Sequence, residues 1–164
     1  MVKKIFLFVF LSLFGHTFAQ TEGFAKNEDS SQTYYKIFGK GAPILIINGG
    51  PGMNSNGFEP MAKILAEKYQ TIVYDQRGTG KSTLKELNDK TVSMKLMADD
   101  IESLRKHLKI QKWTILGHSF GGMLASYYAT IYPNSIDKLI LSSSGGVDLS
   151  LLKGENLIEA GLSK

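Results

Sequence analysis

Ser119 stands at the centre of the segment GHSFG, which matches the pattern G-x-S-x-G. In that pattern the serine occupies a sharp turn between a strand and a helix, where flanking glycines relieve crowding and leave the hydroxyl exposed. The apolar segment WTILG at 113–117 predicts the strand, and a helical pattern follows Ser119. We therefore predict that Ser119 is a nucleophile for acyl transfer. The residues expected to shape this turn are Gly117, His118 and Gly121.

A second glycine-rich segment, NGGPG, follows the apolar run PILIIN at 43–48. Acyl transfer needs backbone N–H donors directed at the oxygen that becomes negative, and glycine lets the backbone approach that oxygen closely. We expect the N–H of Phe120 to be one donor and the N–H of Gly50 to be the other. The start of the following helix adds a partial positive charge at the same place. The other residues expected to support this loop are Asn48, Gly49, Pro51 and Gly52.

A third loop, DQRGTGKS at 75–82, follows the next apolar run. Its GKS ending suggests a phosphate-binding loop, but that motif requires a glycine five positions before Gly80, where this chain has Asp75. The sequence therefore excludes a nucleotide site of this type. We expect Asp75 and Arg77 instead to brace the loop beside the active site through charge-assisted hydrogen bonds.

The sequence provides no obvious general base for the serine. Its histidines are His16, His107 and His118, and none follows Ser119. His107 lies beside the apolar face of a predicted helix and is expected at the surface, while His118 is expected to point away from the Ser119 hydroxyl. No metal or organic cofactor is expected, because the histidines lack ligand spacing and the chain has no cysteine.

The elements that position these loops alternate along the chain. Apolar runs predict strands at 34–38, 43–48, 71–75, 113–117 and 136–144, and threefold and fourfold spacing predicts helices at 58–69, 94–108 and 119–132. On the helix at 94–108 we expect Asp99, Glu102 and Lys106 to face outward. This alternation predicts an α/β fold, with a mostly parallel sheet covered by helices on both faces.

Four motifs in this order resemble the N-terminal part of an α/β-hydrolase: NGGPG, DQRGTGKS, DDIESLRKHL at 99–108, and GHSFGG. The chain is most similar to the proline iminopeptidase group of serine peptidases, and the similarity covers about 34–144. Asn48 stands where that group has histidine. His118 and Phe120 stand where it has glycine and tryptophan.

The resemblance implies a triad in the chain order Ser, then Asp or Glu, then His. The family places its acid and base after a helical cap, so Asp148 comes too early to be the acid, and 151–164 resembles the beginning of that cap. We therefore expect the triad acid and base to lie outside this chain. The 164-residue chain is expected to be inactive by itself, because it lacks the base that activates the serine. It is also expected to be poorly soluble, because the strand at 136–142 is left as an apolar edge.

The function implied by the resemblance is that of a serine hydrolase acting through an acyl-enzyme, an aminopeptidase that releases proline from the N-terminus of a small peptide. An esterase, a lipase-like enzyme or another α/β acyl hydrolase is the alternative, because one fold serves many substrates. A non-catalytic vestigial or binding module is a further alternative.

Residues 1–19 are typical of a secretory signal peptide, with Lys3 and Lys4 before an apolar run and cleavage expected after Ala19. The mature protein is then expected in the periplasm or the medium, free of the membrane. Its formal net charge falls from +4 to +2, and its lysines are scattered, so no nucleic acid is expected as a partner. The remaining divisions are a polar lead-in at 20–33, the N-terminal half of the hydrolase core at 34–148 and the start of a truncated cap at 149–164. The sequence does not indicate an oligomeric state.

Overall fold

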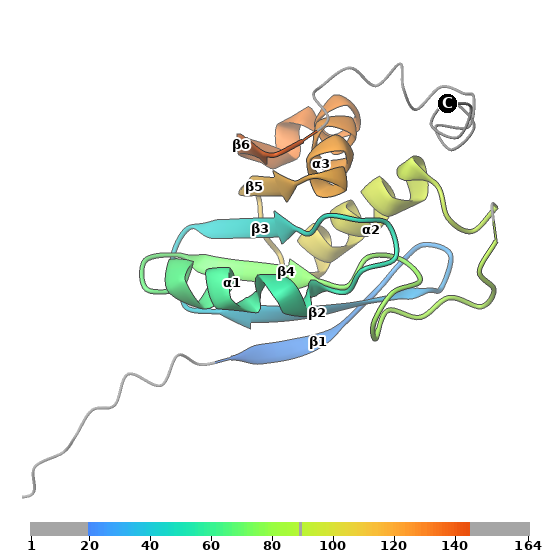
Figure 1. The fold of residues 1–164 in the computed structure, drawn as a ribbon, viewed down its shortest axis with the longest axis horizontal. Helices are drawn as coiled ribbons and strands as arrows, with labels where there is room; N and C mark the ends of the chain where they lie inside the picture. The colour runs from blue at the N-terminus through green and yellow to red at the C-terminus, as the bar shows by residue number, and fades with distance from the viewer. Residues whose placement is uncertain (1–19, 89, 145–164) are drawn as a thin grey trace, which may run out of the picture.

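A six-stranded sheet forms the centre of the protein, in a computed structural model that describes residues 20–88 and 90–144. The strand order is β1-β2-β4-β3-β5-β6, in which β2 is antiparallel to β1 and β4 and the remaining pairs are parallel (Figure 1). The expected signal peptide, Asp148 and the cap segment lie outside the described residues. The strands are β1 Thr21–Lys26, β2 Gln32–Phe38, β3 Pro43–Ile47, β4 Gln70–Tyr74, β5 Trp113–His118 and β6 Ile136–Ser142.

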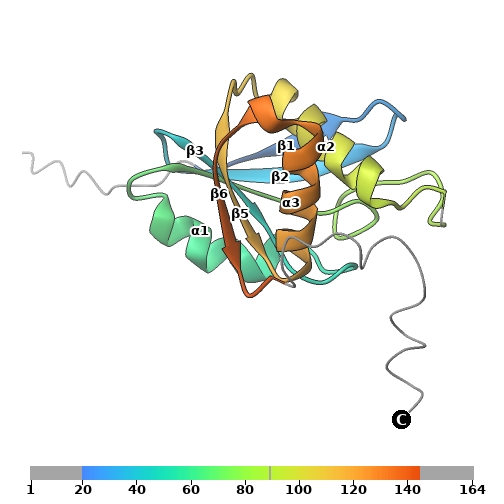
Figure 2. The same cartoon turned by 90° about the horizontal axis from the view of Figure 1, so that it is seen from above.

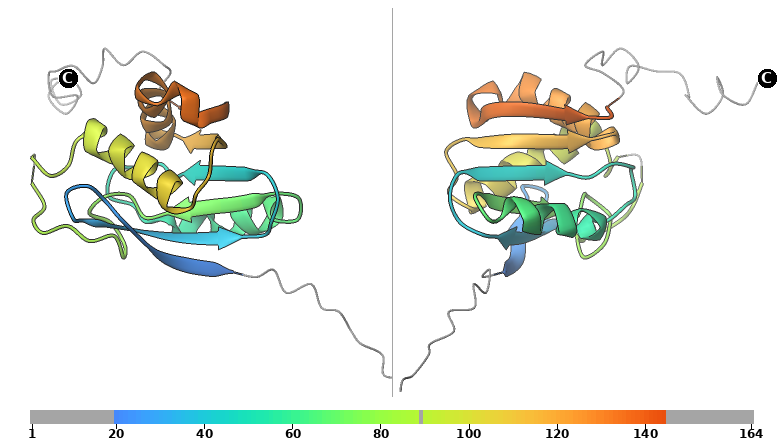
Figure 3. Two further views of the ribbon diagram at one scale, coloured as in Figure 1. Left: turned by 180° about the vertical axis from the view of Figure 1, so that it is seen from behind. Right: turned by 60° about the vertical axis from the view of Figure 1, so that its left-hand side comes forward.

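Helices cover both faces of this sheet, as the sequence predicts for an α/β fold. The helices are α1 Glu59–Leu65, α2 Met94–His107 and α3 Phe120–Ile131, with short 3-10 helices η1 Ser55–Phe58 and η2 Pro133–Ser135. α1 lies on one face, and α2 and α3 lie on the other (Figures 2 and 3). Ser93 caps the start of α2, because its side chain accepts a hydrogen bond from the Leu96 N–H. The last turn of α2 carries basic residues that complement the helix dipole.

The central strand β3 is buried on both faces, which explains its unbroken apolar sequence. Leu45 and Ile47 pack with α2 and α3 in one cluster, and Ile44 and Ile46 pack with α1 in the other. Because side chains alternate along a strand, a single run of β-branched and leucine residues supplies both cores. No helix in the described part of the chain is long and apolar enough to cross a membrane.

The 20–33 lead-in contains a strand that the sequence analysis did not predict. β1 pairs with β2 as an antiparallel hairpin, and the buried Asn27 side chain donates hydrogen bonds to Ser31 and Thr33 in the connecting turn. Only Ala25 of β1 is buried, so the strand lacks the apolar alternation that would have revealed it. Among the described residues, the sheet therefore starts at Thr21, within the segment expected to be a polar lead-in.

The prediction that Glu102 faces outward is wrong. Its side chain is buried and accepts hydrogen bonds from the Tyr128 hydroxyl at 2.8 Å and the Ser135 hydroxyl at 3.1 Å. Arg105 on the same helix pairs with the same carboxylate. Burial is tolerated because every charge-bearing oxygen has partners, and the network fixes α2 against α3 and η2. Lys106 faces outward as predicted.

β6 forms one edge of the sheet, as the sequence predicts. Among the described residues it pairs with β5 alone. Leu139, Ile140 and Leu141 on this strand are exposed. An exposed apolar edge strand can pair with another chain, which is the physical basis of the expected poor solubility.

Candidate active site

The turn at Ser119 has the geometry that a nucleophilic serine requires. Ser119 joins the end of β5 to the start of α3 with φ 52° and ψ −121°, a conformation that non-glycine residues rarely adopt. Its N–H donates to the Ser142 carbonyl at 3.0 Å, and its own carbonyl accepts from the Gly122 N–H at 2.9 Å. The strained turn leaves the Ser119 side chain exposed at the carboxyl end of the sheet.

The glycine loop after β3 lies directly against this turn. A Cβ placed on Gly49 would stand 3.0 Å from the Cβ of Ser119, so a side chain there would crowd Ser119. Gly50 follows with φ 66°, in the left-handed region that favours glycine. Pro51 and Gly52 form the exposed tip of the loop. Because the carboxyl ends of parallel strands meet at one edge of a sheet, β3 and β5 bring the two motifs together.

Gly50 and Phe120 carry the two backbone N–H groups that the sequence analysis expects to bind an oxyanion. Within residues 20–88 and 90–144, no backbone or side-chain acceptor takes a hydrogen bond from the N–H of Gly50 or of Phe120. Phe120 is the first residue of α3, and the first N–H groups of a helix have no partner within the helix. Gly117 and Gly121, on either side of the serine, are buried.

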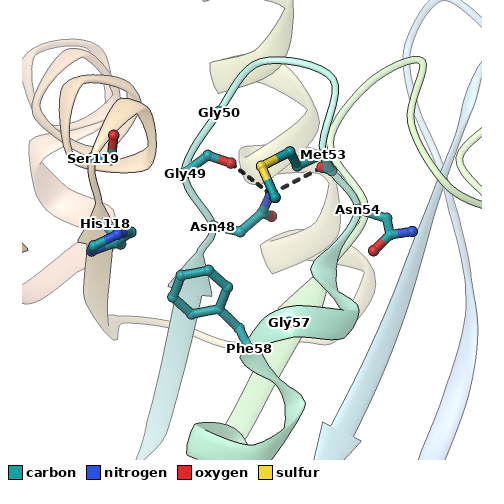
Figure 4. Close-up of a pocket in the computed structure, with 9 residues that line it drawn as sticks. All are labelled: Asn48, Gly49, Gly50, Met53, Asn54, Gly57, Phe58, His118 and Ser119. Carbon is teal, nitrogen blue, oxygen red and sulfur yellow. Dashed lines mark hydrogen bonds between the residues drawn. The ribbon is translucent and has the colours of Figure 1, made fainter.

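A cavity of about 410 Å³ opens beside Ser119 (Figure 4). The side chains of Met53 and Phe58 line it, together with the ring of His118. None of the lining residues carries a permanent charge, so the cavity suits an uncharged apolar group. The full lining is Asn48, Gly49, Gly50, Met53, Asn54, Gly57, Phe58, His118 and Ser119.

Neither described histidine is placed to act as the base. The His118 ring lies 5.5 Å from the Phe58 ring, with its Nδ1 3.3 Å from the Ser142 hydroxyl, and points away from the Ser119 hydroxyl (Figure 4). His107 is exposed, with Nε2 3.2 Å from the Tyr35 hydroxyl. In the described part of the chain, acidic and histidine side chains form no group of three or more that could hold a metal ion.

Asp75 binds the segment that follows the glycine loop. One of its buried carboxylate oxygens accepts from both the N–H and the hydroxyl of Ser55, each at 2.8 Å, and the other accepts from the Lys81 N–H at 2.8 Å. The Asp75 carbonyl also accepts from the Ser82 hydroxyl at 2.6 Å. One carboxylate thus connects the end of the glycine loop to the loop after β4.

Arg77 does not brace the active-site loop, and that expectation is wrong. Its guanidinium pairs with both oxygens of Asp100 on α2 and with Asp29 in the β1–β2 turn. Burial raises the pKa of Asp100 to about 6, although Arg77 opposes this shift. Partial burial acts to raise the pKa of the more exposed Asp29 as well. Hydrogen bonds from Arg77 and Ser31 outweigh this effect and lower the pKa of that carboxyl to about 2. Arg77 therefore fixes the N-terminal hairpin to α2.

Comparison with known proteins agrees with this geometry. Residues 42–159 match the family described as the alpha/beta hydrolase fold, which is more than half of the chain.

The chain belongs to the α/β-hydrolase family.

Its relatives include a proline iminopeptidase of Lactobacillus helveticus, 39% identical over 119 residues, and one of Arabidopsis thaliana, 35% identical over 128 residues. These alignments cover 69% and 74% of this chain but 40% and 32% of the relatives. A solved esterase from Exiguobacterium antarcticum superposes with a TM-score of 0.69 and 31% identity, over 77% of this chain and 46% of that one. The chain thus spans less than half the length of the relatives it matches.

Several residues of this α/β-hydrolase site were not predicted from the sequence. Met53 and Phe58 line the cavity from the segment after the glycine loop, and Ser55 links that segment to Asp75. The buried Gln76 donates to the Asn48 carbonyl at 2.7 Å. The only sequence feature that pointed to Gln76 was its position between Asp75 and Arg77, the two residues expected to brace the loop. The sequence does not show which residue of this loop faces the site.

Proposed function

We propose that this α/β-hydrolase is a serine hydrolase that acts through an acyl-enzyme. The observation that carries the proposal is the exposed Ser119 in a strained turn, next to the glycine loop, with N–H groups on Gly50 and Phe120 that have no acceptor among the described residues. The Ser119 oxygen attacks the substrate carbonyl carbon while a base takes its proton. The two N–H groups stabilise the oxyanion, and the intermediate then collapses and expels the leaving group, which takes the proton. Water releases the acyl group by the same steps in reverse.

The substrate proposed is a peptide with N-terminal proline. This rests on the proline iminopeptidases among the relatives, which are 35–39% identical to this chain. The cavity beside Ser119 supports it, because an apolar space of about 410 Å³ is large enough for a pyrrolidine ring. No carboxylate lines the cavity, so a group that binds the substrate amine would come from outside the described residues.

An esterase is the second candidate. The uncharged lining favours it, because an ester of a simple carboxylic acid brings no charge that needs a partner, and a solved esterase is 31% identical over the matched region. A binding or vestigial module without catalysis is the third candidate.

We also propose that the general base comes from polypeptide outside these 164 residues. No histidine follows Ser119 in the sequence, and His107 and His118 are directed elsewhere. Without its base, a serine site retains roughly 10³ to 10⁴-fold catalysis over water, a small part of a full enzyme's acceleration. The chain alone is therefore proposed to be nearly inactive.

Reading the encoding DNA beyond codon 164 tests the source of the base. An in-frame or once-frameshifted continuation that encodes a late Asp and His supports the proposal, and a continuation without them favours the non-catalytic module. The protein that carries the continuation is then assayed on L-proline p-nitroanilide and on p-nitrophenyl acetate, beside Ser119→Ala. Ser119-dependent release of nitroaniline supports the aminopeptidase, and turnover of the acetate alone favours the esterase.

Export is proposed as well, with cleavage after Ala19. The described fold supports it, because β1 begins at Thr21, so removal of residues 1–19 leaves every described strand intact. N-terminal sequencing of the protein from the native host tests this. A mature chain that begins at Gln20 agrees, and a retained Met1 contradicts it.

A further inference from the structure

The glycine loop beside Ser119 is held at its two ends by neighbouring residues of the loop after β4. Beyond its far end, at the start of η1, Ser55 donates two hydrogen bonds to Asp75. At its near end, the Asn48 carbonyl accepts a hydrogen bond of 2.7 Å from the side-chain amide of Gln76. Gln76 therefore controls the point at which the chain leaves β3 and enters the loop that contains Gly50.

The orientation of the Gln76 amide is fixed by this contact. The side chain is 1% exposed, and its Oε1 has no hydrogen-bond partner among the described residues. Turning the amide over would set Oε1 against the Asn48 carbonyl, so that two acceptors would face each other. The donor orientation is the one that the site can satisfy.

Asn48 transmits this constraint to both sides of Gly50. Its side-chain amide donates to the Gly49 carbonyl at 3.1 Å and to the Met53 carbonyl at 3.0 Å (Figure 4). Gln76 thus holds Asn48 by its backbone, and Asn48 holds the loop before and after Gly50. The same loop lies against the Cβ of Ser119 at Gly49.

We propose that Gln76 is a positioning residue for the oxyanion hole, acting through the Asn48 carbonyl to hold the Gly50 N–H in place beside Ser119. This inference rests on the proposed hydrolase function, because an oxyanion forms only if Ser119 attacks a substrate. Gln76 does not line the cavity, so it acts on the loop and not on the substrate. Loss of its N–H donor should slow steps that place negative charge on the substrate oxygen, because such steps depend on donor placement to within about 1 Å.

The test measures how fast a fluorophosphonate probe modifies Ser119, by intact mass, with imidazole supplied as an external base. We compare the native chain with Gln76→Met, which keeps the side-chain length and removes the donor. Asn27→Leu is the matched control, because it removes another buried amide, in the β1–β2 turn. Measured where all three are folded, Gln76→Met should be about 10 to 100-fold slower and Asn27→Leu within about twofold of native. Equal rates for Gln76→Met and native would overturn the proposal.

Gln76→Glu adds a readout that a purely structural role would not move. A protonated carboxyl can donate to the Asn48 carbonyl, and an ionised one cannot. The ratio of the Gln76→Glu rate to the native rate should therefore rise as the pH falls. A ratio that stays constant or falls would overturn the proposal.

A native chain that is not modified at Ser119, even with imidazole, would count against the proposed function rather than against the loop contact. In that case the ¹H–¹⁵N cross-peaks of Gly49 and Gly50 decide the inference, with Gly57 as a reference outside the loop. Gln76→Met should shift or broaden the two loop glycines and leave Gly57 in place. Unchanged cross-peaks for Gly49 and Gly50 would overturn the inference independently.

Discussion

A β-carbon on Gly121 would stand 2.5 Å from the carbonyl oxygen of Asn48 and closer still to that of Ile47. The first turn of α3 therefore packs directly on the backbone where β3 enters the glycine loop. The second glycine of GHSFG is required by this contact between the two motifs, in addition to the turn itself. Ser119 and the Gly50 loop can be adjacent only while the chain has no side chain at position 121.

Gly121→Ala should destabilise the fold by about 3 kcal/mol, because the methyl group meets backbone atoms that cannot move without shifting β3. Urea unfolding followed by circular dichroism measures this. Gly57→Ala is the matched control, since a β-carbon there has no neighbour within 4 Å, and it should change stability by less than about 1 kcal/mol. Equal effects of the two substitutions would contradict the packing argument.

Ser119→Gly should make the protein more stable while removing the proposed nucleophile. At φ 52° and ψ −121° a serine is strained by about 1–3 kcal/mol, and glycine relieves most of that strain. Part of the gain is lost because glycine has more freedom in the unfolded chain, so a net increase of about 1 kcal/mol is expected. Ser119→Ala, which keeps a β-carbon, should not show this gain in the same unfolding experiment. A destabilised Ser119→Gly variant would mean that the turn is not strained.

Asp100→Ala should be strongly destabilising at neutral pH. It removes the buried carboxylate that binds two nitrogens of the buried Arg77 guanidinium and leaves only Asp29 as an ion-pair partner. Removing one partner of a buried ion pair costs about 3–5 kcal/mol, and the remaining contact with Asp29 keeps the expected loss at the lower end of that range. The double variant Asp100→Ala with Arg77→Met removes both charges and should recover part of the loss. If the double variant is no more stable than Asp100→Ala, the buried pair is not the source of the effect.

The Asp29 carboxyl should make stability depend on pH at the acid end. Its pKa is lowered from 3.8 to about 2 in the folded protein, so its contribution is present above about pH 4 and is lost as the pH falls toward 2. Asp29→Asn should therefore be less stable than the native protein at pH 7, and the difference should shrink as the pH falls. Unfolding midpoints in urea at several pH values measure this. A difference that is constant with pH would contradict it.

The central strands and the serine turn could be predicted from the sequence because their signals are local. β3 is an apolar run buried on both faces, and β5 is an apolar run with one face fully buried. The G-x-S-x-G spacing identifies Ser119 without reference to distant residues. The bounds of α2 followed from the spacing of its apolar face. The family, the fold class and the mostly parallel sheet could all be predicted from such local signals.

Other features depend on partners far away in the sequence, and these could not be predicted. Arg77 pairs with Asp29 and Asp100, which are 48 and 23 residues away. Its position in the loop after β4 therefore led to the wrong expectation, that it braces the loop beside the active site. Glu102 is buried because Tyr128 and Ser135 bring hydroxyl groups to it from 26 and 33 residues along the chain. Gln76 is similar, since its contact with Asn48 arises only when β3 and β4 lie side by side.

The most direct test of the central claim is intact-mass analysis of the folded chain after treatment with a fluorophosphonate probe, with and without imidazole, beside Ser119→Ala. The account predicts one phosphonyl group on Ser119, added slowly by the chain alone and at least about 10-fold faster with imidazole, and none at this site in Ser119→Ala. Modification that is equally fast in Ser119→Ala, or no modification of Ser119 with imidazole present, would contradict the assignment of Ser119 as the nucleophile.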